Sequence, residues 1–235
     1  MLDVPIVVLT GAGISAESGV PTFRGADGLW RNFKPEDLAT PEAFARDPKL
    51  VWEWYAWRRE VIARCQPNAA HRVLVEMEQR LGRGDFTLVT QNVDGLHEAA
   101  GSQSILRLHG SIWSIRCTRE GTRYLDRRVP LEEIPPHCPD CGALLRPDVV
   151  LFGEALEGYV LEAAIDASRR AKTMIAIGTS AIVQPAASLP VLAKRNGARL
   201  IEINPDETPL SAHADEVLRG PAAVELPRWW ALQVG

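Results

Sequence analysis

The sequence predicts an α/β fold built on a parallel β-sheet. Short apolar segments with strand character alternate with amphipathic segments of helical length along most of the 235 residues, which is the pattern of β-α-β units. The first strand, Ile6–Thr10, runs directly into Gly11-Ala12-Gly13, and Ala16 follows three residues later. This G-x-G-x-x-A pattern between a strand and a helix is typical of a Rossmann-like domain.

The glycine-rich segment after the first strand has the chemistry of an anion site. Gly11 permits a tight turn, and Gly13 has no side chain that would hold a pyrophosphate away from the backbone. Backbone N–H groups at a helix start attract anions; a glycine-rich turn without ligand is the other interpretation. In a dehydrogenase an acidic residue that binds the adenosine ribose follows about 20 residues on, but residues 22–28 read as a loop. The sequence therefore favours NAD, in a pose other than that of hydride transfer.

The composition argues against several classes of protein. The formal net charge of −4 disfavours broad nucleic-acid binding, which needs a basic surface. The chain has no run of about 18 apolar residues that would predict a membrane span, and its N-terminus lacks a basic lead and a cleavage site. We therefore expect a cytoplasmic protein with neither nucleic acid nor membrane as partner. In that compartment the four cysteines favour metal binding or burial over disulfides.

Two insertions interrupt the expected sheet. The first lies between the first strand and the next one, Phe86–Thr90. It contains helical segments at Pro35–Leu38, 41–44 and 47–65. A later segment, residues 116–142, is rich in turns. We assign the small domain to a helical insertion, 30–69, and a zinc-ribbon-like insertion, 116–142, and the Rossmann-like domain to 1–29, 70–115 and 143–235.

Polar or small residues follow the expected strands. Further strands are expected at 105–108, Thr173–Ile177 and 200–203, and helices at 71–80, 156–171 and 185–196. The residues after the strand ends are Gln91, Asn92 and Asp94, then His109, then Gly178, Thr179 and Ser180, and last Asn204 and Asp206. Ligands bind outside the carboxyl ends of parallel strands, so we expect a binding site at this edge.

Several of these positions have a chemical interpretation, and two of them also have a structural alternative. Asn92 and Asp94 could simply cap the helix that follows them. His109 differs from the other histidines because it stands at a strand end, where an imidazole can take a proton at neutral pH. Thr179, Ser180 and Asn204 suit an adenosine ribose and would replace the missing acidic residue.

The segment GAGISAESGVPTFR, together with Gln91-Asn92-Val93-Asp94, Leu108-His109-Gly110, Gly178-Thr179-Ser180 and Asn204, resembles the signature of the sirtuins, the NAD-dependent protein deacylases. The similarity covers nearly the whole chain. It implies NAD as co-substrate and acylated lysine side chains of proteins as substrate. It also implies that the acyl oxygen attacks the nicotinamide ribose, after which a ribose oxygen takes over the acyl group.

The resemblance implies a role for each site residue. His109 is the general base, Asn92 and Asp94 contact the nicotinamide end, and Gln91 contacts the ribose. The backbone at Val149, Phe152 and Gly153 pairs with the substrate peptide, and main-chain pairing suits many sequences. The NAD-binding residues would be Gly11, Ala12, Gly13, Ala16, Glu17, Thr22, Phe23, Arg24, Trp30, Gln91, Asn92, Asp94, Gly178, Thr179, Ser180, Asn204, Asp206 and Ala222.

Arg58 lies on the apolar face of the expected helix 47–65. The residues that recur there at helical spacing are Val51, Trp54, Tyr55, Arg58, Val61 and Ile62. A partly buried guanidinium needs an anion, because a desolvated unpaired charge is costly; alternatively Arg58 reaches water or pairs with a carboxylate from another segment. Tyr55-x-x-Arg58 also resembles the Y-x-x-R motif of the sirtuin branch that removes succinyl and malonyl groups. That resemblance implies that both side chains hold the acyl carboxylate.

Three cysteines suggest a metal site. Cys138-Pro139-Asp140-Cys141 is a C-x₂-C turn suited to tetrahedral zinc, and Cys117 precedes it. The sirtuin pattern has two such pairs, whereas Cys117 here stands without a second cysteine. Glu120, His137 or water could complete a structural zinc site, or the site could be free of metal.

The sequence thus predicts an NAD-dependent protein-lysine deacylase that removes succinyl or malonyl groups, and acetyl groups as well. Its products would be nicotinamide and O-acyl-ADP-ribose. The alternatives are a plain deacetylase or mono-ADP-ribosyltransferase on the same scaffold, and a dinucleotide sensor without turnover. His109, Asn92 and Asp94 disfavour the sensor.

Overall fold

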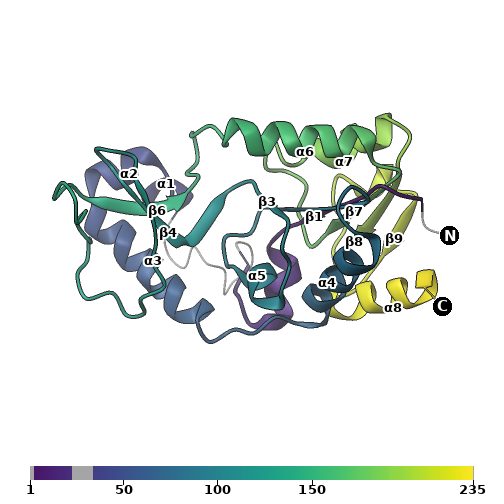
Figure 1. Ribbon diagram of the computed structural model, residues 1–235, viewed down its shortest axis with the longest axis horizontal. Helices are drawn as coiled ribbons and strands as arrows, with labels where there is room; N and C mark the ends of the chain where they lie inside the picture. Colours follow the sequence, from purple (N-terminus) through teal and green to yellow (C-terminus); the bar gives the residue numbers. More distant parts are fainter. Residues whose placement is uncertain (1–2, 23–33, 235) are drawn as a thin grey trace.

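The computed structural model describes residues 3–22 and 34–234. It contains a large unit around a six-stranded sheet and a small unit around a three-stranded sheet, arranged along the long axis of the molecule (Figure 1). Phe23, Arg24 and Trp30, predicted from the resemblance to contact NAD, lie outside the described residues. No helix within these ranges is long and apolar enough to span a bilayer.

The large sheet is parallel throughout, as the sequence predicts. Its strand order is β3-β2-β1-β7-β8-β9. The strands are β1 (Ile6–Thr10), β2 (Phe86–Thr90), β3 (Ile105–Arg107), β7 (Thr173–Ile177), β8 (Arg199–Ile203) and β9 (Glu216–Leu218). Every residue of β1 and β7 is buried, because helices cover both faces of a parallel sheet.

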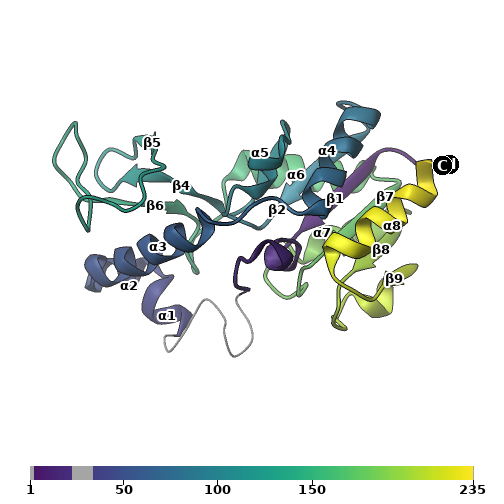
Figure 2. The same ribbon diagram turned by 90° about the horizontal axis from the view of Figure 1, so that it is seen from below.

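Helices cover the two faces as separate layers. One face carries α4 (Ala69–Leu81), α8 (Ala222–Val234) and the 3₁₀ helix η1 (Ala12–Ser18). The other carries α6 (Gly158–Arg170) and α7 (Ser188–Arg195) (Figures 1 and 2). Alternate residues of β1 enter different cores, Ile6 and Val8 facing α4 and Val7 and Leu9 facing α6. Trp229 and Trp230 of α8 pack into the first core.

Some elements differ in length or type from those that the sequence predicts. The helix expected at 185–196 is α7, which begins only at Ser188, and β3 ends at Arg107. The helix after the glycine-rich turn is the 3₁₀ helix η1. Asn68 begins α4 because its side chain accepts a hydrogen bond from the Ala70 N–H (2.9 Å).

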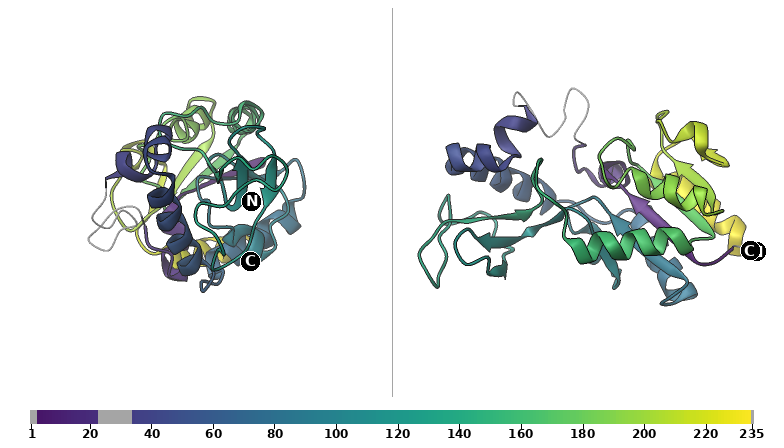
Figure 3. Two further views of the ribbon diagram at one scale, coloured as in Figure 1. Left: turned by 90° about the vertical axis from the view of Figure 1, so that its left-hand side faces the viewer. Right: turned by 90° about the horizontal axis from the view of Figure 1, so that it is seen from above.

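The small unit contains α1 (Pro35–Leu38), α2 (Pro41–Arg46), α3 (Pro48–Ile62) and a sheet ordered β5-β4-β6. The strands are β4 (Gly110–Cys117), β5 (Arg123–Leu125) and β6 (Leu145–Val149). Strands β4 and β6 pair antiparallel and pack on α3 (Figure 3). The strands of this sheet therefore begin before and end after the turn-rich segment 116–142.

Helix α3 is buried on two sides, not one. Trp52 and Arg59, which lie off the expected apolar face, are also buried. The Trp52 indole donates to the Leu145 carbonyl (2.8 Å) and Arg59 Nε donates to the Ile112 carbonyl (2.9 Å). Arg59 Nη1 also lies 3.5 Å from the buried carboxylate of Asp126. These contacts hold one side of α3 against the small sheet and turn its other side toward the large unit.

The glycine-rich turn crosses the end of β7 at backbone contact distance. Gly11 N–H donates to the Ile177 carbonyl and Gly13 N–H donates to the Gly178 carbonyl, both at 2.9 Å. A Cβ on Gly13 would lie 2.7 Å from Gly178 Cα, and one on Gly178 would lie 2.5 Å from Ile14 N. Gly178 also has a φ of +57°. Glycine is needed at both positions for packing within the protein.

We predict that Gly178→Ala lowers the free energy of unfolding by about 2–5 kcal/mol. The left-handed backbone costs about 1–2 kcal/mol for an L-residue and the overpacking costs about 1–3 kcal/mol. The matched control is Gly197→Ala, since Gly197 has a φ of +89° and no atom within 4 Å of a built Cβ. That control should lose only the first contribution. Denaturant unfolding measures both, and equal losses would contradict the close approach.

Candidate active site

A cleft of about 650 Å³ lies at the carboxyl edge of the large sheet and extends to α3 of the small unit. Most predicted site residues in the described ranges line it. They are Gly11, Ala12, Gly13, Ala16, Glu17, Thr22, Tyr55, Arg58, Gln91, Asn92, Asp94, His109, Val149, Phe152, Gly153, Gly178, Thr179, Ser180, Asn204 and Asp206. Ala222 is absent from this lining and is buried at the start of α8.

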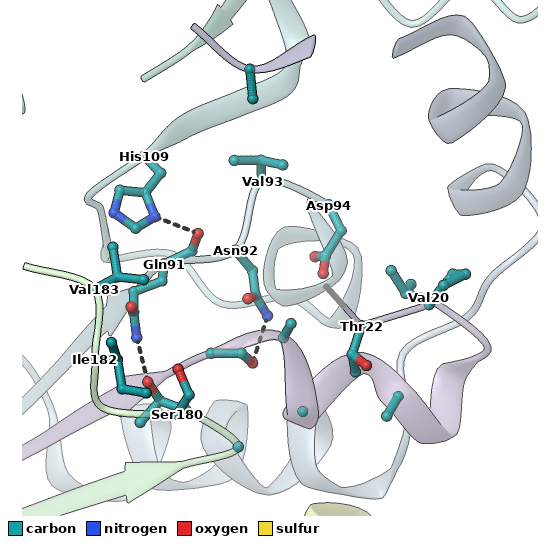
Figure 4. Close-up of a pocket in the computed structure, with 18 of the residues that line it drawn as sticks. Val20, Thr22, Gln91, Asn92, Val93, Asp94, His109, Ser180, Ile182 and Val183 are labelled. Carbon is teal, nitrogen blue, oxygen red and sulfur yellow. Dashed lines mark hydrogen bonds between the residues drawn. The ribbon is translucent and has the colours of Figure 1, made fainter. Parts of the chain in front are cut away.

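The residues after β2 tie three strand ends together. Gln91 Nε2 donates to Thr179 Oγ1 after β7, and Asn92 Nδ2 donates to the Gly11 carbonyl after β1, both at 3.0 Å. Figure 4 shows Gln91, Asn92 and Asp94 in succession along one side of the pocket, with His109 beside Gln91. The amide side chains therefore form the floor of the cleft where the strands end.

Asp94 both supports the next helix and faces the cleft. Its Oδ1 accepts a hydrogen bond from the N–H of Leu96 (2.9 Å), the first residue of α5 (Leu96–Ala100), whose N-cap is Gly95. Its Oδ2 accepts from the Ser15 hydroxyl (2.8 Å). Burial raises the pKa of Asp94, and these two hydrogen bonds oppose the rise.

His109 is oriented as a neutral base. Its Nδ1 lies 3.0 Å from the Gln91 carbonyl oxygen. A carbonyl only accepts hydrogen bonds, so Nδ1 carries the proton and the lone pair of the neutral ring is on Nε2. Burial lowers the pKa of His109, and the bond to Gln91 opposes this only in part. The ring is thus available as a proton acceptor at neutral pH.

Tyr55 and Arg58 form the far end of the cleft, on α3. The exposed fractions of the two residues are 1% and 4%. The guanidinium carbon of Arg58 lies 4.7 Å from the ring centroid of Trp54 and 5.3 Å from that of Tyr55. Burial lowers the pKa of Arg58, whereas Tyr55 and Asp94 raise it. The side chain lies in a largely apolar wall that also includes Val20.

The edge expected to bind a peptide is held by a partly buried ion pair. Both Nη atoms of Arg146 donate to the carboxylate of Glu154, at 2.6 and 2.9 Å. Arg146 also donates to the Val149 carbonyl (3.0 Å), and Glu154 accepts from the Leu151 N–H (2.9 Å). These contacts fix the turn that carries Phe152, which is 49% exposed at the mouth of the cleft.

Sequence reasoning missed other residues of the cleft. Trp54 stands beside Arg58, and its place on the apolar helix face was the signal that could have identified it. Ile182 and Val183 line the mouth and are partly exposed, as Figure 4 shows. Two apolar residues in a loop give no functional signal in the sequence.

A buried carboxylate supports the loop at 204–209, which lines the end of the cleft beside Thr179. Glu202 of β8 accepts hydrogen bonds from Ser211 Oγ (2.5 Å) and Arg219 Nη1 (3.3 Å). Arg219 Nη1 also donates to the Asp206 carbonyl (2.9 Å). The loop is therefore held from below by an ion pair.

The three predicted cysteine ligands come together at the end of β4. The sulfurs of Cys117, Cys138 and Cys141 lie within 4.8 Å of one another, and all are free thiols. Three thiolates fit the donor chemistry of zinc. His137, a suggested fourth ligand, is exposed, and its Nδ1 instead lies 2.9 Å from the carboxylate of Glu133.

The family model and the most similar relatives point to the same protein family. A model of the Sir2 family matches residues 11–185. The chain is 55% identical over 228 residues to an NAD-dependent protein deacylase of Aquifex aeolicus (strain VF5), which covers 97% of this chain and 95% of the relative. It is 54% identical over 217 residues to NAD-dependent protein deacylase 1 of Archaeoglobus fulgidus, covering 92% and 88% of the two chains.

Solved structures agree with these relatives. The crystal structure of a Sir2 homolog–NAD complex has a TM-score of 0.89 and 51% identity, covering 98% of this chain and 90% of that one. A structure of Sir2 with a p53 peptide and NAD+ has a TM-score of 0.84 and 33% identity, covering 97% and 92%.

Two buried histidines beneath the cleft should make stability depend on pH. Burial lowers the pKa of His71 to about 3 and that of His97 to about 4. The unfolded chain takes up these protons near pH 6.5 and the folded chain does not. The free energy of unfolding should therefore fall as pH drops from 6.5 toward 4, by up to about 1.4 kcal/mol per pH unit for each histidine.

Denaturant unfolding between pH 7 and 4 measures this slope. His97→Gln should reduce it, whatever that change does to stability at pH 7. His213→Gln, at an exposed histidine, is the control and should leave it unchanged. An unchanged slope in His97→Gln would show that His97 takes up its proton in the folded state.

Proposed function

Because this chain belongs to the Sir2 family and is an NAD-dependent protein deacylase, we propose that it prefers lysines that carry an acidic acyl group, succinyl or malonyl. The observation that carries the proposal is the buried Arg58 beside Tyr55 at the far end of the cleft. A succinyl group ends in a carboxylate, which a guanidinium can bind with two parallel hydrogen bonds. Burial lowers the pKa of Arg58, so a bound carboxylate would stabilise its charged form.

An acetyl group is expected to react more slowly, not to be excluded. The apolar lining from Val20, Trp54 and Ile62 can accept a methyl group. An acetyl group, however, places no charge near Arg58. The same scaffold acting as a plain deacetylase or as a mono-ADP-ribosyltransferase is the alternative, and the test below separates them.

We propose the following roles along the cleft. NAD, as co-substrate, would supply a ribose carbon that the acyl oxygen of the modified lysine attacks while the bond from that carbon to nicotinamide breaks. Asn92 and Asp94 would hold the nicotinamide end, and Gln91 the adjoining ribose. The turn from Gly11 to Ala16 would hold the pyrophosphate, because its glycines place no side chain between the backbone and the anion. Thr179, Ser180, Asn204 and Asp206 would bind the adenosine half, together with the loop that Arg219 supports.

His109 would act in the second half of the reaction. Its Nε2 lone pair, fixed by the Nδ1 contact with Gln91, would take the proton of a ribose hydroxyl. That deprotonated oxygen can then attack the acyl carbon. Water completes the release of lysine and O-acyl-ADP-ribose.

We propose that the substrate is an extended segment of a protein. The edge at 149–153 would pair with its backbone, which requires little sequence preference. Phe152, Ile182 and Val183 would contact the residues next to the acyl-lysine, since they are exposed at the mouth of the cleft. The solved structure of Sir2 with a p53 peptide and NAD+ supports a protein substrate.

We also propose a cytoplasmic location. The free cysteines support it, because thiols stay reduced in that compartment.

We predict that His109→Ala leaves NAD binding nearly intact and lowers turnover by roughly 10²–10⁴-fold, the usual contribution of a general base. Because the pKa of His109 is lowered, the acid limb of the pH–kcat/KM profile should lie below pH 6.5. His137→Ala, at an exposed histidine, is the control. Turnover near the wild-type value in His109→Ala would remove the assigned role.

We predict that the wild type favours a succinyl-lysine peptide over the matched acetyl-lysine peptide. A hydrogen bond between charged groups contributes about 1.5–3 kcal/mol, so the ratio of kcat/KM should be on the order of 10-fold to 150-fold. Arg58→Met should erase most of this preference and spare deacetylation. Tyr55→Phe should act more weakly, since one neutral hydrogen bond contributes about 0.5–1.5 kcal/mol.

Arg64→Met is the matched control, because Arg64 is exposed just beyond the end of α3. It should leave the ratio unchanged. If the wild type favours acetyl-lysine, or if Arg58→Met lowers both activities equally, Arg58 is structural and the enzyme is an ordinary deacetylase.

A further inference from the structure

The three clustered cysteines lie on two turns of the same construction. In the first turn the Gly121 N–H donates to the Cys117 carbonyl (3.0 Å), and in the second the Gly142 N–H donates to the Cys138 carbonyl (2.9 Å). Both glycines have a φ of +71°. The turns are therefore related position by position, with Cys117 corresponding to Cys138.

The correspondence extends to the groups that face the sulfurs. The backbone N–H of Glu120 donates to Cys117 Sγ (3.4 Å), and the backbone N–H of Cys141 donates to Cys138 Sγ. Glu120 thus occupies in the first turn the position that Cys141 occupies in the second. Each turn therefore directs a backbone N–H at the sulfur of its first cysteine.

The sulfur positions suit one tetrahedral ion. Zinc–sulfur bonds of about 2.3 Å at tetrahedral angles place neighbouring sulfurs about 3.8 Å apart. Here Cys117 and Cys141 are 3.5 Å apart and all three sulfurs lie within 4.8 Å. Cys65 does not belong to this set, because its thiol donates to the Val61 carbonyl at the end of α3 (3.4 Å).

We propose that this cluster binds one zinc ion through three thiolates and one oxygen ligand, at the vertex for which position 120 is the counterpart of Cys141. The two turns present four equivalent positions, and three of them carry cysteine. The fourth carries Glu120, whose side chain is exposed and offers a carboxylate, a known zinc ligand. The oxygen comes either from this carboxylate or from a water molecule in its place.

An oxygen ligand has a consequence for how firmly the metal is held. Structural zinc sites are closed by four protein ligands, and a water in the fourth position leaves it exchangeable. A carboxylate closes the site but is a harder ligand than a thiolate, so with either oxygen zinc should be lost to a chelator faster than from a site with four sulfurs. The ion would still join the end of β4 to the turn before β6.

The test is X-ray absorption and zinc analysis of the full-length protein purified with zinc present. We expect one zinc per chain with three sulfurs at about 2.3 Å and one oxygen at about 2.0 Å. Glu120→Cys should give four sulfurs and slow the loss of zinc to a chelator by at least about tenfold. Changing a residue that only hydrogen-bonds to a metal ligand already alters metal affinity by about tenfold or more. Glu132→Cys, which places a thiol on an exposed residue of the same insertion, should change neither.

Glu120→Ala separates the two oxygen sources. Faster loss of zinc assigns the oxygen to the carboxylate, and an unchanged rate assigns it to water. Absence of zinc, four sulfurs in the wild type, or three sulfurs in Glu120→Cys would overturn the proposal. None of these readouts depends on which acyl group the enzyme prefers, so either proposal can fail alone.

Discussion

The site depends on the parallel register that brings β1, β2 and β7 to the same height. Thr10 pairs with Thr90 on one side and with Ile177 on the other. The segments after these strands therefore start level, and the hydrogen bonds of Gln91 and Asn92 join them. Every polar group at the floor of the cleft is placed by this alignment. A slip of one residue would turn each strand's buried side chains to the opposite face.

Helix α3 lies between the acyl end of the cleft and the small sheet. One side carries Tyr55 and Arg58 into the cleft, and the other carries Trp52 and Arg59 into the small sheet. Arg59 in turn lies against Asp126, in the insertion that holds the three cysteines. The contacts of Arg59 with the small sheet and with Asp126 therefore help to hold the acyl end of the cleft in position.

The sequence predicts the parallel sheet and most of the cleft because both follow from local patterns. Strands such as Thr173–Ile177 are short, apolar and followed by glycine, and their ends must meet at one edge. The small sheet could not be predicted in the same way. Its strands β4 and β6 pair 110–117 with 145–149 across an insertion, and no local periodicity specifies a partner so distant. The burial of Arg59 and the role of Ile182 and Val183 likewise depend on tertiary contacts.

The central claim is that one cleft joins NAD chemistry to an acidic acyl group. Mass spectrometry of the products from a succinyl-lysine peptide and NAD tests it most directly. The account predicts unmodified lysine peptide, nicotinamide and O-succinyl-ADP-ribose in equal amounts. A peptide that gains the mass of ADP-ribose, or nicotinamide release only with the acetyl-lysine peptide, would contradict it.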